Sequence, residues 1–414
     1  MNQKKHIIIL GGGQTAAYAA QEIRKINASS KLTIISEENH LPYERPPLSK
    51  DLILDKINFD QCLFFSKNYY LKNNIDFVKN TKIVSADFLN QKIYSLKETA
   101  FNYDKLLIAT GSSNKLLTVD KKEILPDENL IYLRNVDESV KIKNKITKAN
   151  NILIIGGGFI GLEIASSSSQ LGKKVTILER GDQLMGRVIP REIASIVEEK
   201  HKNNGNKIYL NADIKKINKL ETGSYELFFN SSEKIISDLI IVGIGSLPNT
   251  DIFKNTKLNI ENGIVTDEYC QTSVTNIYAA GDVANFYHPY YGMHIRLEAF
   301  KHAQNHGINA GKNIVGNKTS YKEIPWMWSD QFDLNLQMTG LCYDFDNIAQ
   351  RGKDLSEGII YFFLKSRKII GACGIGVGGK IGRDIRLAGK LSEKNIKVTK
   401  EILADKKQKL NKII

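Results

Sequence analysis

The stretch that decides the fold is Gly11-Gly12-Gly13-Gln14-Thr15-Ala16, which directly follows the apolar run from His6 to Leu10. Glycines between a buried strand and a helix permit a tight turn and let the backbone approach a pyrophosphate at the positive end of the helix. One such match is weak evidence, because a strand-to-helix turn often needs glycine for its own geometry. The flanks predict a β-α-β unit that ends at about Ser36.

The same signal occurs again in Gly156-Gly157-Gly158-Phe159-Ile160-Gly161, after the apolar run from Ile152 to Ile155. Each copy is followed by a strand that ends in glycine, at Tyr103 to Gly111 and at Asp238 to Gly245. This order predicts an internal duplication of a nucleotide-binding domain. Two fingerprints with correct flanks predict two dinucleotides on one chain, as expected for a flavoprotein that is reduced by a nicotinamide cofactor.

An acidic residue about twenty positions past the glycines is expected to accept hydrogen bonds from a ribose. In the second unit this residue is Glu179, whose charge would repel a 2′-phosphate and therefore favours NADH over NADPH. Arg180 follows directly and weakens that preference, since a guanidinium can pair with the phosphate. In the first unit Ser36 stands at the strict offset and Glu37 one position later, and we expect Glu37 to be the ribose ligand.

The composition of the chain is that of an ordinary globular protein. Its 414 residues are enough for roughly two or three domains, and no uninterrupted apolar run reaches membrane-spanning length. Four cysteines, far apart and without paired spacing, argue against a disulfide scaffold, a metal site and a redox dithiol. The N-terminal residues lead straight into the first strand without a secretory segment, so we expect a cytoplasmic protein.

The character of the sequence changes from about Pro325 onward. Trp326 and Trp328 are followed by alternating runs such as Gly358 to Leu364, which predict antiparallel strands. We therefore expect an α/β protein with two Rossmann-like dinucleotide-binding domains, for FAD and NAD, and a C-terminal α+β interface domain. The predicted boundaries are 1–114 together with 247–324 for the FAD domain, 115–246 for the NAD domain and 325–414 for the third domain.

A proline-restricted segment from Pro42 to Lys50 carries two cations and follows the first β-α-β unit. With a flavin nearby, Lys50 is a candidate to lie beside the ring, and a buried ammonium requires a carboxylate partner. Glu163, two residues past the last fingerprint glycine, is the expected partner. Asp282, after the strand from Ile277 to Ala280, is a candidate to bind a ribityl chain, although a Gly-Asp pair is more often a turn or a helix cap.

Together these motifs resemble one family, the ferredoxin reductase type of the FAD-dependent pyridine nucleotide-disulfide oxidoreductases. This type includes the reductases of putidaredoxin, of rubredoxin and of aromatic-ring dioxygenases. The resemblance covers essentially the whole chain. Besides the two fingerprints it rests on five stretches: Pro42 to Lys50, Ala109 to Gly111, Gly243 to Asn249, Ile277 to Asp282 and Pro325 to Gln331.

The resemblance implies an NADH-dependent enzyme in which a hydride passes to N5 of FAD and single electrons leave for a 2Fe–2S ferredoxin or a rubredoxin. That carrier would feed an oxygenase such as a cytochrome P-450 or a ring-hydroxylating dioxygenase. The resemblance also implies an ion pair between Lys50 and Glu163 beneath the flavin, a nicotinamide site gated by Phe159, and Trp328 between the flavin and the partner surface. We expect a monomer or a homodimer.

The net charge of +13 is compatible with nucleic acid, acidic lipid or an acidic protein partner, and because the lysines are spread along the chain the charge alone decides nothing. It would suit an acidic electron-carrier protein, and we expect no nucleic-acid partner. The candidate residues for the docking patch are Arg296, Arg351, Lys353 and Arg386.

The predicted catalytic residues are Lys50, Glu163 and Trp328, and no metal ligand is predicted. The predicted cofactor-binding residues fall into two groups. Those for FAD are Gly11, Gly13, Thr15, Glu37, Arg45, Lys50, Val84, Ala109, Gly111, Arg134, Asp282, Glu298, Phe300 and Trp328, of which Arg134, Glu298, Phe300 and Trp328 are implied by the resemblance alone. Those for the nicotinamide dinucleotide are Gly156, Gly158, Phe159, Ile160, Gly161, Glu179 and Gly245.

Two other functions remain compatible with the sequence. One is an NADH-dependent flavoenzyme that reduces a small acceptor of the quinone type, which needs no cysteine. The other is a redox-dependent binding module that resembles apoptosis-inducing factor and would turn over slowly with NADH. A disulfide reductase is disfavoured, because the segment Arg45 to Lys50 holds no thiol where such enzymes carry one.

Overall fold

The computed structural model describes residues 5–186 and 188–413, which form two compact units. Unit 1 consists of Met1–Glu44, Asp60–Ser113 and Leu247–Pro325. Unit 2 consists of Arg45–Phe59, Asn114–Ser246 and Trp326–Ile414. Each unit is discontinuous in sequence, since the chain passes from one to the other after residues 44, 59, 113, 246 and 325.

A five-stranded parallel sheet lies at the centre of unit 1, in the strand order β22-β7-β1-β2-β3. The strands are β1 (His6–Leu10), β2 (Lys31–Ile35), β3 (Ile75–Val78), β7 (Lys105–Ile108) and β22 (Ile277–Ala279). They are nearly continuous apolar runs, as a sheet covered on both faces requires. Ile8 and Ile9 on β1 are accordingly fully buried.

Two smaller sheets and several helices complete unit 1. An antiparallel sheet contains β4 (Ile83–Asp87), β5 (Lys92–Ser95) and β6 (Ala100–Asn102). A second sheet contains β20 (Ile260–Glu261), β21 (Gly263–Thr266), β23 (Ala284–His288) and β24 (Met293–Ile295). The helices are α1 (Gln14–Ile26), α2 (Lys67–Lys72), η2 (Phe59–Cys62), η3 (Asp251–Phe253), η4 (Gly281–Val283) and α6 (Phe300–Ile314).

Helices α1 and α6 pack closely against each other. A Cβ atom on Gly307 would lie 2.4 Å from the backbone oxygen of Thr15, and one on Gly311 would lie 2.8 Å from that of Ala19. A side chain at either position would push α6 away from α1. These two glycines therefore keep α6 against the helix that begins at the first glycine turn.

Unit 2 contains a second five-stranded parallel sheet, in the order β11-β18-β12-β13-β14. Its strands are β11 (Leu130–Tyr132), β12 (Asn151–Ile155), β13 (Lys174–Leu178), β14 (Lys207–Tyr209) and β18 (Leu239–Val242), and its helices are α3 (Val136–Lys148), α4 (Phe159–Gln170) and α5 (Arg191–Asn203). In both parallel sheets the strand before the glycine turn is central, between the second strand of its own unit and the strand that ends in glycine. This repeated order agrees with the predicted duplication.

Short antiparallel strands accompany the second parallel sheet. They are β9 (Leu117–Val119) with β10 (Lys122–Ile124), and β15 (Ile214–Lys219) with β16 (Tyr225–Phe229) and β17 (Glu233–Ser237). The strands β8 (Ser112–Asn114) and β19 (Ser246–Pro248) carry the chain between the units.

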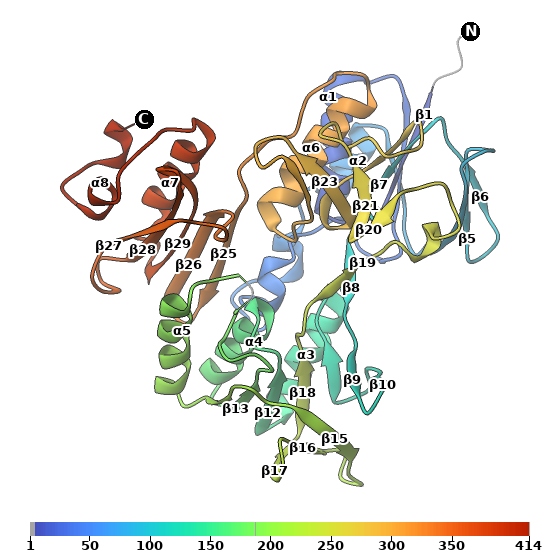
Figure 1. The fold of residues 1–414 in the computed structure, drawn as a ribbon. Coiled ribbons are helices and arrows are strands. Elements are labelled where there is room, and N and C mark those ends of the chain that lie inside the picture. The colour runs from blue at the N-terminus through green and yellow to red at the C-terminus, as the bar shows by residue number, and fades with distance from the viewer. Residues whose placement is uncertain (1–4, 187, 414) are drawn as a thin grey trace. The chain divides into compact units, whose positions relative to one another are not determined.

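The C-terminal part of unit 2 is an antiparallel sheet with two helices, drawn in orange to red in Figure 1. The strand order is β25-β26-β29-β28-β27. The elements are β25 (Trp326–Gln331), β26 (Leu334–Gly340), β27 (Asn347–Arg351), β28 (Ile359–Lys365), β29 (Lys368–Val377), α7 (Gly382–Glu393), α8 (Lys400–Ala404) and η5 (Leu410–Lys412). The predicted fold class, two nucleotide-binding domains of α/β type and a C-terminal α+β domain, is confirmed.

Residues 45–59 group with unit 2, whereas the predicted boundaries assigned them to the FAD domain. Ser139 Oγ on α3 donates a hydrogen bond to Leu48 O at 2.6 Å, and Ser167 Oγ on α4 donates one to Ser49 O at 2.8 Å. These bonds attach the short helix η1 (Pro46–Ser49) to unit 2. The sequence did not reveal that residues 45–59 group with unit 2, because this segment directly follows residues of unit 1 in the chain.

Replacing Gly307 by alanine should destabilise the protein, because the added methyl group would overlap the backbone of α1 and no rotamer change can relieve the overlap. We expect a loss of about 1–3 kcal/mol and a fall of several degrees in the unfolding midpoint measured by calorimetry. Gly389→Ala in α7 is the matched control, since its methyl group would first meet the hydroxyl of Thr339, a side-chain atom, at 2.9 Å. Equal midpoints for the two variants would contradict this packing.

Candidate functional site

The first glycine turn joins β1 to the start of α1. Gly11 has a φ of +123°, and a Cβ atom there would lie 2.1 Å from the backbone oxygen of Ala109, so only glycine fits. Gly111, which follows β7, also has a positive φ, of +66°. The Cβ position of Gly13 faces open space, with no atom of the described chain within 4 Å. The turn therefore leaves room at the positive end of α1, as a pyrophosphate requires.

Further predicted FAD-binding residues of unit 1 lie around this helix end. A Cβ atom on Gly281 would lie 2.3 Å from Thr15 Oγ1, so the Gly281-Asp282 pair lies against the start of α1. Gln14 Nε2 donates a hydrogen bond to Phe300 O at 2.9 Å, which holds the first residue of α6 at the same place. The structure thus brings Thr15, Asp282 and Phe300 together at the glycine turn, and the residues present fit the phosphate and ribityl portions of FAD.

Three other predicted FAD contacts in unit 1 have more exposed or already paired side chains. Glu37 follows β2 and forms an exposed ion pair with Lys82, at 2.9 Å. Val84 lies on β4 and is 39% exposed. Glu298 forms an ion pair with Arg296. The contact of these three residues with FAD stays a prediction.

The second glycine turn joins β12 to α4 in unit 2. Gly156 has a φ of +106°, and a Cβ atom on Gly161 would lie 2.2 Å from the backbone oxygen of Gly156, so α4 lies directly against the turn. Around the Cβ position of Gly158 the nearest atom is the backbone oxygen of Gly243, at 3.8 Å. The second turn therefore also leaves room beside the N-terminal end of its helix, as the first turn does at α1. The other predicted residues here are Phe159 and Ile160, which begin α4, and Gly245, which has a φ of +109°.

Glu179 lies at the end of β13 and closes the second glycine turn. Its Oε2 accepts a hydrogen bond from Gly157 N at 2.6 Å, and its Oε1 accepts one from Gly181 N at 2.6 Å. The carboxylate is therefore fixed beside the turn, where a ribose of a bound dinucleotide is expected. Arg180 is exposed next to it, so the two opposing influences on coenzyme choice remain side by side in the structure.

The three predicted catalytic residues lie together in unit 2, although they come from the end of η1, from α4 and from β25. Lys50 Nζ lies 3.2 Å from Glu163 Oε1 and 5.7 Å from the centre of the Trp328 ring. Asp330 Oδ2 lies 3.7 Å from the same ammonium and accepts a hydrogen bond from Trp328 Nε1 at 3.0 Å. Lys50 is therefore a cation held between two carboxylates and the face of an indole ring.

Glu163 is only 4% exposed and accepts two hydrogen bonds from serine hydroxyl groups. Ser49 Oγ donates to Oε2 at 2.5 Å, and Ser329 Oγ donates to Oε1 at 2.6 Å. Buried carboxylates require such donors, yet neither serine was predicted from the sequence. The sequence could have indicated both serines by their position, because Ser49 directly precedes Lys50 and Ser329 directly follows Trp328.

Arg45 and Arg134, both predicted to contact FAD, are neighbours in unit 2. The guanidinium of Arg45 donates a hydrogen bond to the backbone oxygen of Arg134. Glu138 Oε2 accepts a hydrogen bond from Arg134 N at 2.6 Å, as part of the capping arrangement at the start of α3. The Arg45 side chain therefore lies against the backbone just before this helix.

The cysteines show no sign of redox function. All four are free thiols, and Cys62, Cys270 and Cys373 are buried. Burial raises the pKa of Cys342 to about 12 and the pKa of Cys270 well above its usual value. Since the thiolate is the reactive form, burial makes Cys342 and Cys270 poor nucleophiles.

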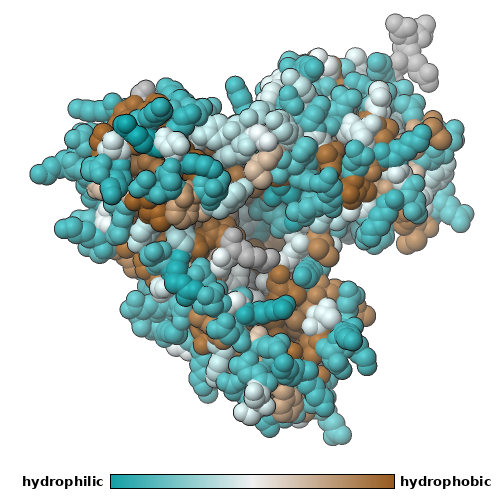
Figure 2. Space-filling model, viewed as in Figure 1, coloured by the Kyte–Doolittle hydropathy of each residue, from teal (hydrophilic) through white to brown (hydrophobic). Residues whose placement is uncertain are grey.

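Two of the four residues predicted for a basic docking patch are not available for docking. Arg351 is 6% exposed, pairs with Asp384 at 2.9 Å, and donates to backbone oxygens at the end of α8 and beyond. Arg296 is also largely covered and pairs with Glu298. These predictions were wrong because spacing in the sequence does not reveal burial, whereas Lys353 and Arg386 are exposed as expected. Figure 2 shows that hydrophilic side chains cover much of the visible face.

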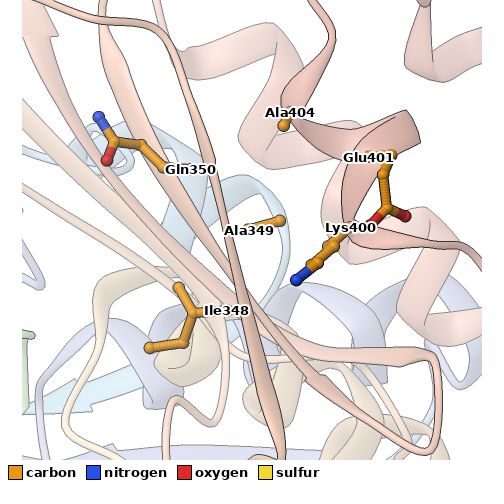
Figure 3. A pocket seen from close by; sticks show the side chains of 6 residues that line it. All are labelled: Ile348, Ala349, Gln350, Lys400, Glu401 and Ala404. Atoms are coloured by element: carbon orange, nitrogen blue, oxygen red, sulfur yellow. The ribbon is translucent and has the colours of Figure 1, made fainter.

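A small hollow in the C-terminal part of unit 2 lies between β27 and α8 (Figure 3). Its volume is about 280 Å³, and it is lined by Ile348, Ala349, Gln350, Lys400, Glu401 and Ala404. None of the predicted catalytic or cofactor-binding residues is among them. Over residues 5–186 and 188–413, no group of three potential metal ligands occurs, and no helix is long and apolar enough to cross a membrane.

Comparisons with known proteins extend over nearly the whole chain. Residues 5–307 match the family described as pyridine nucleotide-disulphide oxidoreductase, and residues 326–414 match the one described as reductase C-terminal. The chain is 33% identical to a rubredoxin-NAD(+) reductase of Ectopseudomonas oleovorans, over 83% of this chain and 88% of the relative. It is 32% identical to a rhodocoxin reductase of Rhodococcus erythropolis, over 87% and 84% respectively. A solved ferredoxin reductase from Rhodopseudomonas palustris superposes with a TM-score of 0.91 at 28% identity, covering 99% of both chains.

Two buried histidines, one in each unit, predict how stability depends on pH. Burial lowers the pKa of His201 and of His302 to about 4, from the ordinary 6.5. The unfolded chain therefore binds more protons than the folded protein between these values. The contribution of each histidine to the free energy of unfolding is fully present above about pH 6.5. It is lost as the pH drops toward 4, by up to about 3 kcal/mol for each histidine.

Urea unfolding at pH 7.5 and pH 5.0 measures this effect. The free energy of unfolding should be lower at pH 5.0, and His302→Phe should show a shallower dependence on pH than wild type. His294→Phe is the control, because His294 is exposed. A free energy of unfolding that does not change between the two pH values would contradict the assignment of these histidines.

Proposed function

The chain belongs to the pyridine nucleotide-disulphide oxidoreductase family, and we propose that within this family it is an NADH-dependent ferredoxin reductase. The family identified from the sequence motifs and the expected oxidoreductase activity are confirmed. FAD is the flavin cofactor of the family, and NADH is the electron donor of its NAD(+) reductases. When bound, FAD takes electrons from NADH as a hydride and allows them to leave one at a time.

The observation that carries the proposal is the cluster of Lys50, Glu163 and Trp328. Lys50 would supply a fixed positive charge beside the bound flavin. This charge would favour the reduced flavin, which carries more negative charge than the oxidised form. Glu163, which is 4% exposed, would fix the orientation of that ammonium through their contact at 3.2 Å. The cluster includes a side chain of α4, the helix that begins at the second glycine turn. The proposed NADH-binding turn and the carboxylate that pairs with Lys50 thus belong to one helix.

We assign one dinucleotide to each of the two glycine turns. The turn at Gly11 to Gly13, with Thr15 and Asp282, would hold FAD, and the turn at Gly156 to Gly161 would hold NADH. Glu179 would accept hydrogen bonds from the adenosine ribose and disfavour a 2′-phosphate.

The proposed electron acceptor is a ferredoxin or a rubredoxin, most simply an acidic 2Fe–2S ferredoxin that feeds an oxygenase. The names of the relatives and the net charge of +13 support this choice. Trp328, beside Lys50, would lie on the route toward that partner. A cytoplasmic location and a monomeric or homodimeric state belong to the same proposal, and four free cysteines suit a reducing compartment.

Reduction of cytochrome c by the purified flavoprotein tests the proposed function. With NADH as donor, one ferredoxin from a panel of 2Fe–2S ferredoxins should raise the rate at least about tenfold over the reductase alone. The stimulation should decrease with added salt, because the attraction of an acidic partner to a basic surface is screened. Each ferredoxin assayed without the reductase provides the control.

Two results would contradict the proposal. Prompt reduction of the flavin by NADH without stimulation by any ferredoxin or rubredoxin would point to a small acceptor of the quinone type. Very slow reduction of the flavin by NADH would instead favour a redox-dependent binding module.

Glu179→Gln should relax the preference for NADH, because the substitution removes the negative charge and keeps an acceptor oxygen. The ratio of kcat/KM for NADH to that for NADPH should fall by about tenfold, mainly through KM. Glu233→Gln, which changes an exposed carboxylate of unit 2, is the control and should leave the ratio unchanged. An unchanged ratio in Glu179→Gln would remove this residue from coenzyme selection.

A further inference from the structure

A chain of buried hydrogen bonds in unit 2 ends on Glu163. It runs from α5 through β25 to α4, and its members are Asn206, His201, Gln331, Ser329 and Glu163. The exposed fractions of these residues are 4%, 0%, 3%, 1% and 4% in that order. Polar groups buried this deeply are costly unless each finds a partner, so the arrangement is a constraint on the fold.

The donors along this chain all point toward Glu163. Asn206 Nδ2 donates to His201 Nδ1 at 2.9 Å, which leaves the ring proton on Nε2. His201 Nε2 then donates to Gln331 Oε1 at 2.9 Å, and this contact fixes the orientation of the amide. Gln331 Nε2 donates to Ser329 Oγ at 3.2 Å. The serine proton is therefore free to point at Glu163 Oε1, 2.6 Å away.

The state of His201 supports this direction. Burial lowers the pKa of His201 to about 4, so the ring is neutral at pH 7 and has one donor nitrogen. A neutral ring with its proton on Nε2 can donate only toward Gln331. An imidazolium would donate from both nitrogens and would conflict with the amide of Asn206.

We propose that Ser329 is a positioning residue for Glu163, and through it for Lys50, and that Gln331 and His201 hold its hydroxyl group in the donor orientation. The proposal rests on the proposed function, because it assigns Lys50 a role in electron transfer. Ser49 Oγ supplies the matching donor to the other carboxylate oxygen, at 2.5 Å. Two hydroxyl donors hold the carboxylate in one orientation, which in turn keeps the Lys50 ammonium 3.2 Å from Oε1.

A purely structural role would give a different result. If the hydrogen bonds served only to satisfy buried polar groups, removal of any one of them would lower stability without changing Glu163. Ser166 offers that comparison, since its Oγ accepts a hydrogen bond from Phe332 N at 2.7 Å. This bond also joins α4 to the chain just after β25 but does not involve Glu163.

The test compares Ser329→Ala, Ser329→Thr and Ser166→Ala in the FAD-containing protein. In Ser329→Ala we expect the infrared carboxylate band of Glu163 to shift from its wild-type position, because one oxygen loses its hydroxyl donor, and we expect no such shift when Ser329→Ala is made in the Glu163→Gln background. We also expect the anaerobic rate of flavin reduction by NADH, measured without any electron acceptor, to fall about tenfold. Ser329→Thr keeps the hydroxyl group and should restore both properties, and Ser166→Ala should retain them despite lower stability.

The nitrogen-15 chemical shifts of the His201 ring test the direction of the chain without relying on activity. Neutral imidazole with the proton on Nε2 is expected at pH 7, and Gln331→Met should leave Ser329 without its orienting donor and give an intermediate rate. A proton on Nδ1, an imidazolium, or wild-type rates in Ser329→Ala would overturn the proposal. If NADH fails to reduce the wild-type flavin, the proposed function fails, while the infrared and nitrogen-15 measurements still decide whether Ser329 and His201 control Glu163.

Discussion

A carboxylate that is 4% exposed needs donors for its oxygens, and Glu163 finds them on separate segments of the chain. Ser49 and Lys50 come from the segment 45–59, and Ser329 comes from β25. Leaving such a charge without partners would cost several kcal/mol, so these segments must meet for unit 2 to be stable. The electrostatic requirement of one side chain thereby contributes to the association of α4 with the C-terminal sheet, together with the bonds between Ser166 and Phe332 N and between His201 and Gln331.

The glycines contribute a second kind of constraint, which is steric. Gly11 and Gly156 adopt positive φ where a side chain would overlap a neighbouring strand, and Gly307 lets α6 approach the backbone of α1. The same turn occurs in both units with the same strand order around it. One structural solution for binding a dinucleotide is therefore used twice, and what distinguishes the halves is the side chains that surround each turn.

The sequence allowed the parts of the fold that follow local patterns to be predicted. Both glycine turns, the buried parallel strands before them and the antiparallel C-terminal strands are local signals, and the meeting of Lys50 with Glu163 followed from the need to pair a buried charge. The burial of Arg351 and the placement of residues 45–59 in unit 2 were not predictable. Both features depend on which distant segment of the chain a residue contacts. The spacing of apolar residues indicates only which face of a helix or strand a residue occupies. Ser329 was missed for the same reason.

The discontinuity of unit 2 has a consequence for biosynthesis. Helix α4 leaves the ribosome long before β25, so Glu163 is made well ahead of the hydroxyl group of Ser329 that it requires. Until the last segment arrives, the carboxylate has to stay hydrated, and the surrounding apolar surface cannot close over it. A prematurely terminated chain would keep this region open to chaperones and proteases. The burial of this charge therefore waits for a segment that is made much later than Glu163 itself.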